Sequence, residues 1–487
     1  MFRVSTRCLA AAAGAATLAL AGAVGWAIAS AQAEEPAAPA DALGEQTGGA
    51  TTVPAEGRNA FSFPFANLDD DERQRFAVGN SFFRRNWVEA PASATARDGL
   101  GPHFIARSCG GCHDQDGRGA PPDIKKGMHE QPIGLLVRLS IPVKGDDPLT
   151  IAPEPTYGEQ FNNRAVGSVR PEGEVRIRLA PVKGKFADGT PYTLQAPHYS
   201  FAKLGYGPMR KDVQLSPRVA PQLQGVGLLD AIAEGDILAN ERAQAEAAGP
   251  IRGQVNRVHD AWSGETRIGR FGWKANVPTL AHQTAGAFLG DMGITSRPFP
   301  DEACTAAQAD CRAAPRGAKG QTHEIDDATL GHVVFYESTL APAARRHASE
   351  PEVLRGQKLF QAAQCAVCHR PSYVTAGAPF PALSTPKVAG VKIWPYTDLL
   401  VHDMGEALAD HRPDGQANGR QWKTPPLWGV GLIRDVNGHQ RLLHDGRANG
   451  VLEAVLWHGG EAEGAKQQVL KMSAAERAAL VKFVESL

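Results

Sequence analysis

Two short segments of the sequence place two cysteines and a histidine at identical spacing. Residues 109–113 read Cys-Gly-Gly-Cys-His, and residues 365–369 read Cys-Ala-Val-Cys-His. Thiols at this spacing can add to the two vinyl groups of one porphyrin, and the histidine that follows can bind its iron. The sequence therefore predicts two covalently bound haem c groups. The predicted attachment points are Cys109, Cys112, Cys365 and Cys368, and the predicted proximal iron ligands are His113 and His369.

Zinc binding or a redox disulfide is the alternative use of such cysteines, because two Cys-x-x-Cys pairs can share one zinc ion. The two motifs begin 256 positions apart (109 to 365), and each is followed directly by histidine. Both features favour haem. Cys304 and Cys311 have no following histidine, so we expect them to form a disulfide that closes a small loop in an exported protein.

The N-terminal segment has the pattern of a secretory signal peptide. Arg3 and Arg7 precede an uncharged, alanine-rich run from Cys8 to Ser30, and Ala-Gln-Ala at 31–33 fits a cleavage site. A retained membrane anchor is the alternative, since the apolar run is long enough to span a bilayer. The small residues at 31–33 favour cleavage, which predicts a periplasmic protein without a stable membrane span in the mature chain.

Composition excludes some partners. The chain has 487 residues, enough for two or three domains, and a formal net charge of −1. No strong electrostatic field therefore attracts nucleic acid or an anionic membrane.

The pattern of apolar residues predicts the elements that would position the two motifs. A helix is expected over 69–88 before the first motif, and Ser349–Glu352 reads as a capping box for a helix that leads into the second. A second capping box, Ser473–Glu476, predicts a C-terminal amphipathic helix. Strands are expected at 135–141 and around 175–179, with a hairpin turn at Asp188-Gly189.

These elements predict a mainly α fold made of two cytochrome c-like haem domains, the first with a large β-containing insertion. The expected divisions are a signal peptide at 1–33, a flexible lead-in at 34–58, an N-terminal haem domain at 59–345 and a C-terminal cytochrome c-like domain at 346–487.

Several further stretches make the sequence resemble the bacterial di-haem cytochrome c peroxidase and methylamine-utilisation superfamily, and within it the di-haem oxidoreductases often labelled thiol oxidoreductases. These stretches are Asp98–Pro102, Asp116–Gly119, Gly225–Ile232, Gly269–Ala275, Tyr396–Gly405, Thr424–Gly429 and His444–Arg447. The resemblance runs from about residue 60 to the C-terminus.

The resemblance implies that one haem transfers electrons and that the other, in enzymatic members, reacts with peroxide. In the peroxidases the C-terminal haem has methionine as its sixth ligand, which makes Met404 the candidate here, with a core side chain as the alternative. A thioether ligand raises the iron potential. The peroxidases also hold calcium between their domains, but no calcium-loop pattern such as Asp-x-Asp-x-Asp-Gly is present in this sequence.

The residues that act at the first haem are not identified by a motif, because the catalytic glutamine and glutamate segment of the peroxidases has no clear counterpart. Glu159 and Gln160 are polar candidates, and Trp273 is a candidate electron bridge or a core residue. Possible iron ligands at the first haem are His103, His198, His259, His282, Lys274 and Met292, and His444 and His458 are further histidines expected near the second.

The expected function is that of a periplasmic, peroxidase-like di-haem oxidoreductase. Electrons from a soluble or membrane-associated donor protein would pass through the C-terminal haem to an oxidant such as hydrogen peroxide at the N-terminal haem. The main alternative is a non-catalytic electron-transfer protein in which both irons are six-coordinate. A third is oxidation of a partner protein. Thiols as substrates gain no support, because the haem and disulfide assignments leave no free cysteine in the mature chain.

Overall fold

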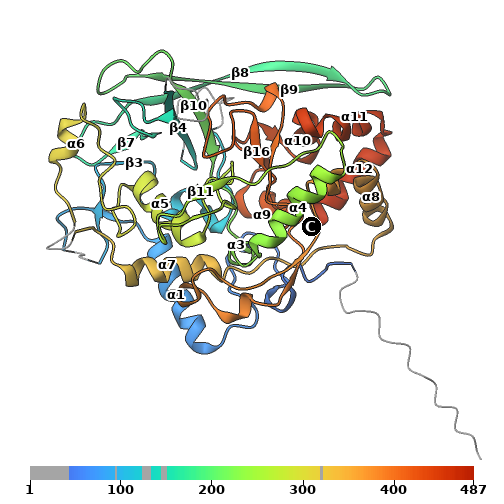
Figure 1. Cartoon of the computed structure of the whole chain (residues 1–487), viewed down its shortest axis with the longest axis horizontal. Helices are drawn as coiled ribbons and strands as arrows, with labels where there is room; N and C mark the ends of the chain where they lie inside the picture. The colour runs from blue at the N-terminus through green and yellow to red at the C-terminus, as the bar shows by residue number, and fades with distance from the viewer. Residues whose placement is uncertain (1–42, 94–95, 123–132, 144–150, 318–321) are drawn as a thin grey trace, which may run out of the picture. The chain divides into compact units, whose positions relative to one another are not determined.

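The computed structural model describes residues 43–93, 96–122, 133–143, 151–317 and 322–487. The predicted signal peptide and residues 34–42 of the predicted lead-in lie outside this part of the chain. Residues Leu43–Leu487 form one unit, shown in Figure 1. The predicted boundary between 345 and 346 falls inside it, and both large hydrophobic clusters draw side chains from either side of that position. The domain boundary stays a prediction.

Local signals explain where the main helices begin. Asp69 caps α1, and Glu72 returns a bond to the Asp69 backbone. The capping box predicted at Ser473 is confirmed at the start of α12. The one predicted at Ser349 is wrong, because α8 begins at Pro351 with Glu350 as its N-cap and without a side-chain cap. The α-helices are α1 Asp70–Arg84, α2 Cys109–Cys112, α3 Val226–Asp230, α4 Glu234–Glu246, α5 Leu280–Met292, α6 Ala309–Ala313, α7 Asp327–Ser338, α8 Pro351–Ala362, α9 Ile433–Asn437, α10 Val451–Trp457, α11 Glu463–Lys471 and α12 Ala474–Ser486.

The strands form one antiparallel sheet, a long hairpin and several short pairs. In the sheet β4 lies between β10 and β5 and also pairs with β6, while β8 and β9 pair along twelve residues each. The predicted strands at 135–141 and 175–179 and the turn at Asp188-Gly189 are confirmed. The strands are β1 Val88–Glu89, β2 Asp98–Leu100, β3 His103–Phe104, β4 Leu135–Pro142, β5 Ile151–Ala152, β6 Gln160–Phe161, β7 Arg164–Ala165, β8 Glu174–Lys185, β9 Pro191–Ala202, β10 Gln214–Val219, β11 Arg257–His259, β12 Thr266–Ile268, β13 Tyr373–Val374, β14 Lys392–Ile393, β15 Val401–Asp403, β16 Gln421–Lys423, β17 Arg441–Leu442 and β18 Ala448–Asn449.

The prediction of a mainly α fold is wrong. The chain has 32% helix and 20% strand, spread over many small sheets, so it is a mixed α and β protein. The short pairs, such as β13 with β14 and β17 with β18, contain two residues per strand. Such strands are too short to show the alternating apolar pattern by which a strand is recognised in a sequence.

The helix before each Cys-x-x-Cys-His motif crosses a second helix at a glycine. A Cβ atom on Gly79 of α1 would lie 2.1 Å from the His332 carbonyl oxygen of α7. A Cβ atom on Gly356 of α8 would lie 2.0 Å from the Ala479 carbonyl oxygen of α12. Both distances are far below van der Waals contact, so each crossing requires glycine.

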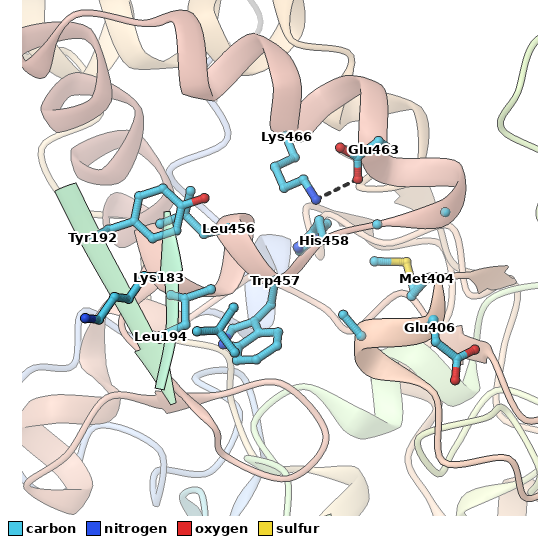
Figure 2. Close-up of a pocket in the computed structure, with 15 residues that line it drawn as sticks. Lys183, Tyr192, Leu194, Met404, Glu406, Leu456, Trp457, His458, Glu463 and Lys466 are labelled. Atoms are coloured by element: carbon cyan, nitrogen blue, oxygen red, sulfur yellow. Dashed lines mark ion pairs between the residues drawn. The ribbon is translucent and has the colours of Figure 1, made fainter. Parts of the chain in front are cut away.

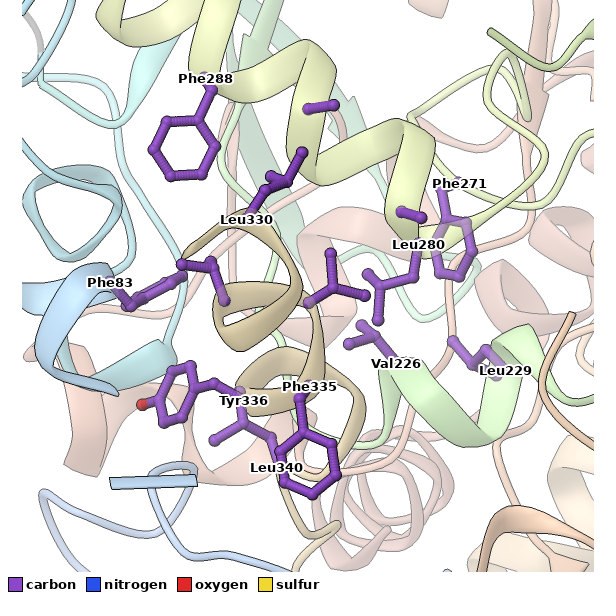
Figure 3. Close-up of a cluster of buried hydrophobic side chains, with 14 of the residues drawn as sticks. Phe83, Val226, Leu229, Phe271, Leu280, Phe288, Leu330, Phe335, Tyr336 and Leu340 are labelled. Carbon is purple, nitrogen blue, oxygen red and sulfur yellow. The ribbon is translucent and has the colours of Figure 1, made fainter. Parts of the chain in front are cut away.

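The larger hydrophobic cluster surrounds α7. Figure 3 shows Leu330, Phe335 and Tyr336 of this helix among side chains from α1, α3 and α5. Phe83 of α1 lies 5.2 Å from Tyr336 between ring centroids. The second cluster holds Phe360 of α8 against Phe483 of α12, with 5.1 Å between centroids. Each motif therefore follows a helix that is anchored in a core by aromatic side chains.

The structure also bears on the predicted disulfide and on the question of a membrane-spanning helix. Cys304 and Cys311 form the predicted disulfide, with 5.8 Å between their Cα atoms. In the ranges that the structure describes, every helix is too short or too polar to cross a membrane.

Candidate haem sites

The second Cys-x-x-Cys-His motif follows α8 and holds its histidine by one ring nitrogen. Nδ1–H of His369 donates to the Tyr396 carbonyl oxygen at 3.1 Å, which leaves Nε2 with its lone pair. Burial lowers the pKa of His369 to about 4, so the imidazole is neutral. A neutral ring fixed through Nδ1 is the form in which histidine binds iron through Nε2.

The first motif repeats this arrangement. Nδ1–H of His113 donates to the Pro221 carbonyl oxygen at 2.8 Å, and burial lowers the pKa of the ring. The two histidines predicted as proximal ligands therefore have matching backbone anchors although the rest of their surroundings differs.

The four cysteines of the motifs suit thioether attachment. None of them forms a disulfide. Burial raises the pKa of Cys112 and of Cys365 to about 12, so both are neutral thiols in the chain without a cofactor. Within the described ranges, one group of potential metal ligands lies close together, formed by Cys368, Asp398 and His402. It contains one motif cysteine, so the four motif cysteines do not lie together in one group.

A buried ion-pair network lies beside the second motif. His402 Nε2 is 2.9 Å from Asp398 and its Nδ1 is 2.8 Å from Glu461, so both ring nitrogens face carboxylates. Burial would lower the pKa of His402, but Asp398 and Cys368 together raise it well above its ordinary value. Nδ1 also lies 3.7 Å from Cys368 Sγ. A fixed imidazolium therefore stands next to one predicted haem attachment point.

A cavity of about 330 Å³ contains Met404, the candidate sixth ligand of the second haem. Figure 2 shows it together with His458 and Trp457 on one side and Lys183 and Tyr192 of the β8–β9 hairpin on the other. The Trp457 indole N–H is buried without a hydrogen-bond partner. An unpartnered donor at the wall of the cavity fits the presence of a polar group from a bound cofactor.

The hairpin is fastened to the C-terminal helices, as its course toward α11 and α12 in Figure 1 indicates. The Ala187 N–H donates to the Leu470 carbonyl oxygen at 2.9 Å. Arg477 lies 2.9 Å from Asp188 and 3.9 Å from the Phe186 ring centroid. These contacts hold Lys183 and Tyr192 at the cavity.

Two carboxyl groups, one partly buried and one buried, lie near the first motif, and neither was predicted from the sequence. Asp291, at the end of α5, accepts a hydrogen bond from Gln160 at 3.0 Å, and burial raises its pKa. Its charge acts on Cys112 and His113.

Glu337 of α7 accepts a hydrogen bond from Thr284 at 2.5 Å. Burial raises the pKa of Cys109, and the charge of Glu337, when it is ionised, adds to this shift. Burial raises the pKa of Glu337 itself to about 8. Glu337 directly follows the run Val333–Tyr336, and this position is a sequence signal for a buried carboxyl group. Asp291 has no comparable signal.

Three of the residues predicted as possible ligands of the first iron form hydrogen bonds or ion pairs with other groups. His103 Nε2 lies 2.9 Å from the Arg170 carbonyl oxygen, and His282 Nδ1 lies 3.3 Å from Asp260. Lys274 is bound to Asp410 at 2.7 Å. The remaining three are Met292, which is buried in the α7 cluster, His259 on β11 and His198 on β9.

The other predicted polar and aromatic residues are placed as follows. Gln160 reaches Asp291 at the first motif, whereas Glu159 offers its carbonyl oxygen to the Leu139 N–H. Trp273 donates from Nε1 to the Val219 carbonyl oxygen at 2.8 Å, two residues before Pro221. His444 stacks on Trp422 with 3.7 Å between centroids. Trp273 thus packs against the segment that anchors His113.

Comparisons with known proteins agree with the two motifs. The family model described as "Di-haem oxidoreductase, putative peroxidase" matches residues 42–149 and 190–487. The unmatched residues contain β8, so one strand of the hairpin falls outside the match. No curated protein matches the chain.

One solved structure is similar at a low level. It is hydrazine synthase of Kuenenia stuttgartiensis, pressurized with 20 bar xenon, and it has 13% sequence identity and a TM-score of 0.29 over 90% of this chain and 96% of that chain. Similarity of this degree does not establish a common fold.

Proposed function

Because the chain belongs to the di-haem oxidoreductase family, we propose that it is a peroxidase-like c-type cytochrome that passes electrons from a donor protein to hydrogen peroxide. The haem at Cys365 and Cys368 would receive the electrons, and the haem at Cys109 and Cys112 would deliver them. Haem supplies the electron transfer and the peroxide chemistry when it is bound, and the protein sets access and proton supply.

The observation that carries this proposal is the difference between the two sites. Two carboxyl groups with raised pKa values, Asp291 and Glu337, lie near the first motif. At the second motif a cavity holds the candidate ligands Met404 and His458. Acids suit a site that must supply protons, while additional iron ligands suit a site that only transfers electrons.

Proton supply follows from the chemistry of the oxidant. Reduction of one hydrogen peroxide to two waters consumes two electrons, which the donor protein provides, and two protons. Glu337 has a pKa of about 8 and so carries a proton at neutral pH, and the raised pKa of Asp291 acts in the same direction. We assign both as proton donors for the first site.

Export supports the same function. Covalent haem attachment and a disulfide belong to an oxidising compartment, and the predicted signal peptide would deliver the chain to the periplasm. There the donor would be a soluble or membrane-associated redox protein.

The test uses the full chain produced with a haem-maturation system. Mass spectrometry should show two haem groups, and the reduced protein should be reoxidised by added hydrogen peroxide. A variant with Cys109→Ser and Cys112→Ser should keep one haem and lose this reaction with peroxide. If both irons of the unmodified protein stay low-spin in every redox state and peroxide changes nothing, the protein is an electron carrier and the proposal fails.

A further inference from the structure

The cavity beside the second motif contains two side chains that can bind iron, and both come from segments that meet closely. Met404 precedes Gly405, and His458 precedes Gly459 and Gly460. A Cβ atom on Gly405 would lie 2.8 Å from the Gly460 nitrogen, and Gly405 has a φ of +77°. This close approach brings the thioether and the imidazole to one cavity.

His458 has the same anchor as the two predicted proximal histidines. Its Nδ1–H donates to the Ala454 carbonyl oxygen at 2.6 Å, one turn earlier in α10. Within the described chain this is the only hydrogen bond of the ring, so Nε2 is left for a ligand. Figure 2 shows the ring at the cavity wall near Lys466, whose ammonium is paired with Glu463 at 2.6 Å.

His458 and His369 also lie close enough to affect each other. A positive charge on His458 disfavours one on His369, which adds to the effect of burial on the pKa of His369. Burial likewise lowers the pKa of His458 itself. Each ring donates from Nδ1 to a backbone carbonyl oxygen, so each can bind a metal through Nε2.

Met404 lacks a comparable anchor. Its backbone N–H donates to the Arg420 carbonyl oxygen at 3.0 Å, but the side chain has flexible torsions and packs against the second hydrophobic cluster. A fixed ring loses less conformational freedom on binding than a flexible thioether does.

We propose that His458, and not Met404, is the sixth ligand of the iron that His369 binds at the second motif. This inference rests on the proposed function, because it requires a haem at Cys365 and Cys368. It makes the electron-accepting iron a bis-histidine centre, whose potential is lower than that of a histidine–methionine centre. The donor protein must then be a correspondingly stronger reductant.

The experiment compares the two-haem protein with three variants, His458→Ala, His458→Met and Met404→Ala, the last being the matched change in the same cavity. We expect the unmodified protein to lack the near-infrared charge-transfer band of thioether ligation. Met404→Ala should keep the low-spin electron paramagnetic resonance signal and the potential of the second iron. His458→Ala should lose that signal, and His458→Met should raise the potential.

A thioether band in the unmodified protein that disappears in Met404→Ala would overturn the inference, and this result does not depend on whether the His458 variants fold. Mass spectrometry separates this failure from that of the proposed function. Two attached haems with a thioether band contradict the ligand assignment alone. A chain that carries no haem at Cys365 and Cys368 contradicts the proposed function and the inference together.

Discussion

His113 and His369 each donate Nδ1–H to a backbone carbonyl oxygen, and each follows a helix that crosses another at a glycine. Their neighbours are different in kind. Carboxyl groups whose pKa is raised by burial, Asp291 and Glu337, lie near the first motif, whereas the second lies beside a fixed imidazolium and a cavity with candidate iron ligands. The motif and the histidine anchor are therefore repeated, and the two sites differ in the groups that surround them.

The largest expected effect concerns proton supply at the first motif. Asp291→Asn or Glu337→Gln should lower the rate of peroxide reduction about 100-fold, the lower end of what a general acid contributes. Steady-state rates with an artificial electron donor measure this. Glu302→Gln is the control, because burial raises the pKa of Glu302 to about 7 but its partner is Arg316. An equal loss in all three variants would contradict a special role for the first two.

The pH dependence of the peroxide rate should reveal the ionisation of Glu337. Glu337 donates only when protonated, and its pKa is raised to about 8, so the peroxide rate should fall as the pH increases through about 8. Glu337→Gln should remove this part of the profile. A profile that is unchanged by the substitution would assign the ionisation to another group.

Near the second motif, the largest loss of stability should follow from breaking the ion pairs of His402. Asp398→Asn removes the carboxylate from a side chain that is 1% exposed. The positive charge of His402 then has one carboxylate partner fewer. Breaking such a pair costs about 3 kcal/mol or more. Denaturant unfolding of the two-haem protein measures the loss, and Glu461→Gln, at 12% exposure, should cost less. Equal costs would show that burial is not what distinguishes the two carboxylates.

Substitutions at the two glycines test whether the helix crossings before the two motifs are equivalent. Gly79→Ala and Gly356→Ala should each destabilise the protein by about 1–3 kcal/mol, because the added methyl group meets a backbone oxygen that cannot yield alone. Gly235→Ala on α4, where a Cβ atom has no neighbour within 4 Å, is the control. Thermal unfolding of the three variants compares the two crossings directly.

The smallest effect is expected at the hairpin that covers the second cavity. Asp188→Asn should speed hydrogen exchange at residues 186–190 by about five-fold or less, because the Asp188 carboxylate is partly exposed to water. The pKa of Asp188 is lowered to about 2, chiefly by hydrogen bonds from Thr190, with Arg477 adding to it. The contribution of this carboxylate is therefore present above pH 3.8, the unperturbed value, and is lost as the pH falls toward 2. Unchanged exchange would mean that Ala187 and Phe186 hold the hairpin without it.

The sequence by itself determined the features that depend on neighbouring residues. The two Cys-x-x-Cys-His motifs, the capping box at Ser473, the long strands and the Cys304–Cys311 pair were all recognisable, because their spacing along the chain is the signal. The capping box at Ser349 failed although its pattern was correct, since α8 begins one residue later than that pattern requires.

The tertiary structure decided what surrounds each motif. Glu337 and Asp291 are more than 170 positions from His113 (291 minus 113 is 178), and His458 is 89 positions from His369 (458 minus 369). No local pattern joins residues so far apart, and the two-residue strands that helped to disprove a mainly α fold form only when distant segments meet. Burial then changes the chemistry of these groups, because removing water disfavours the charged form of a carboxyl or an imidazole. That step exists only in the folded chain.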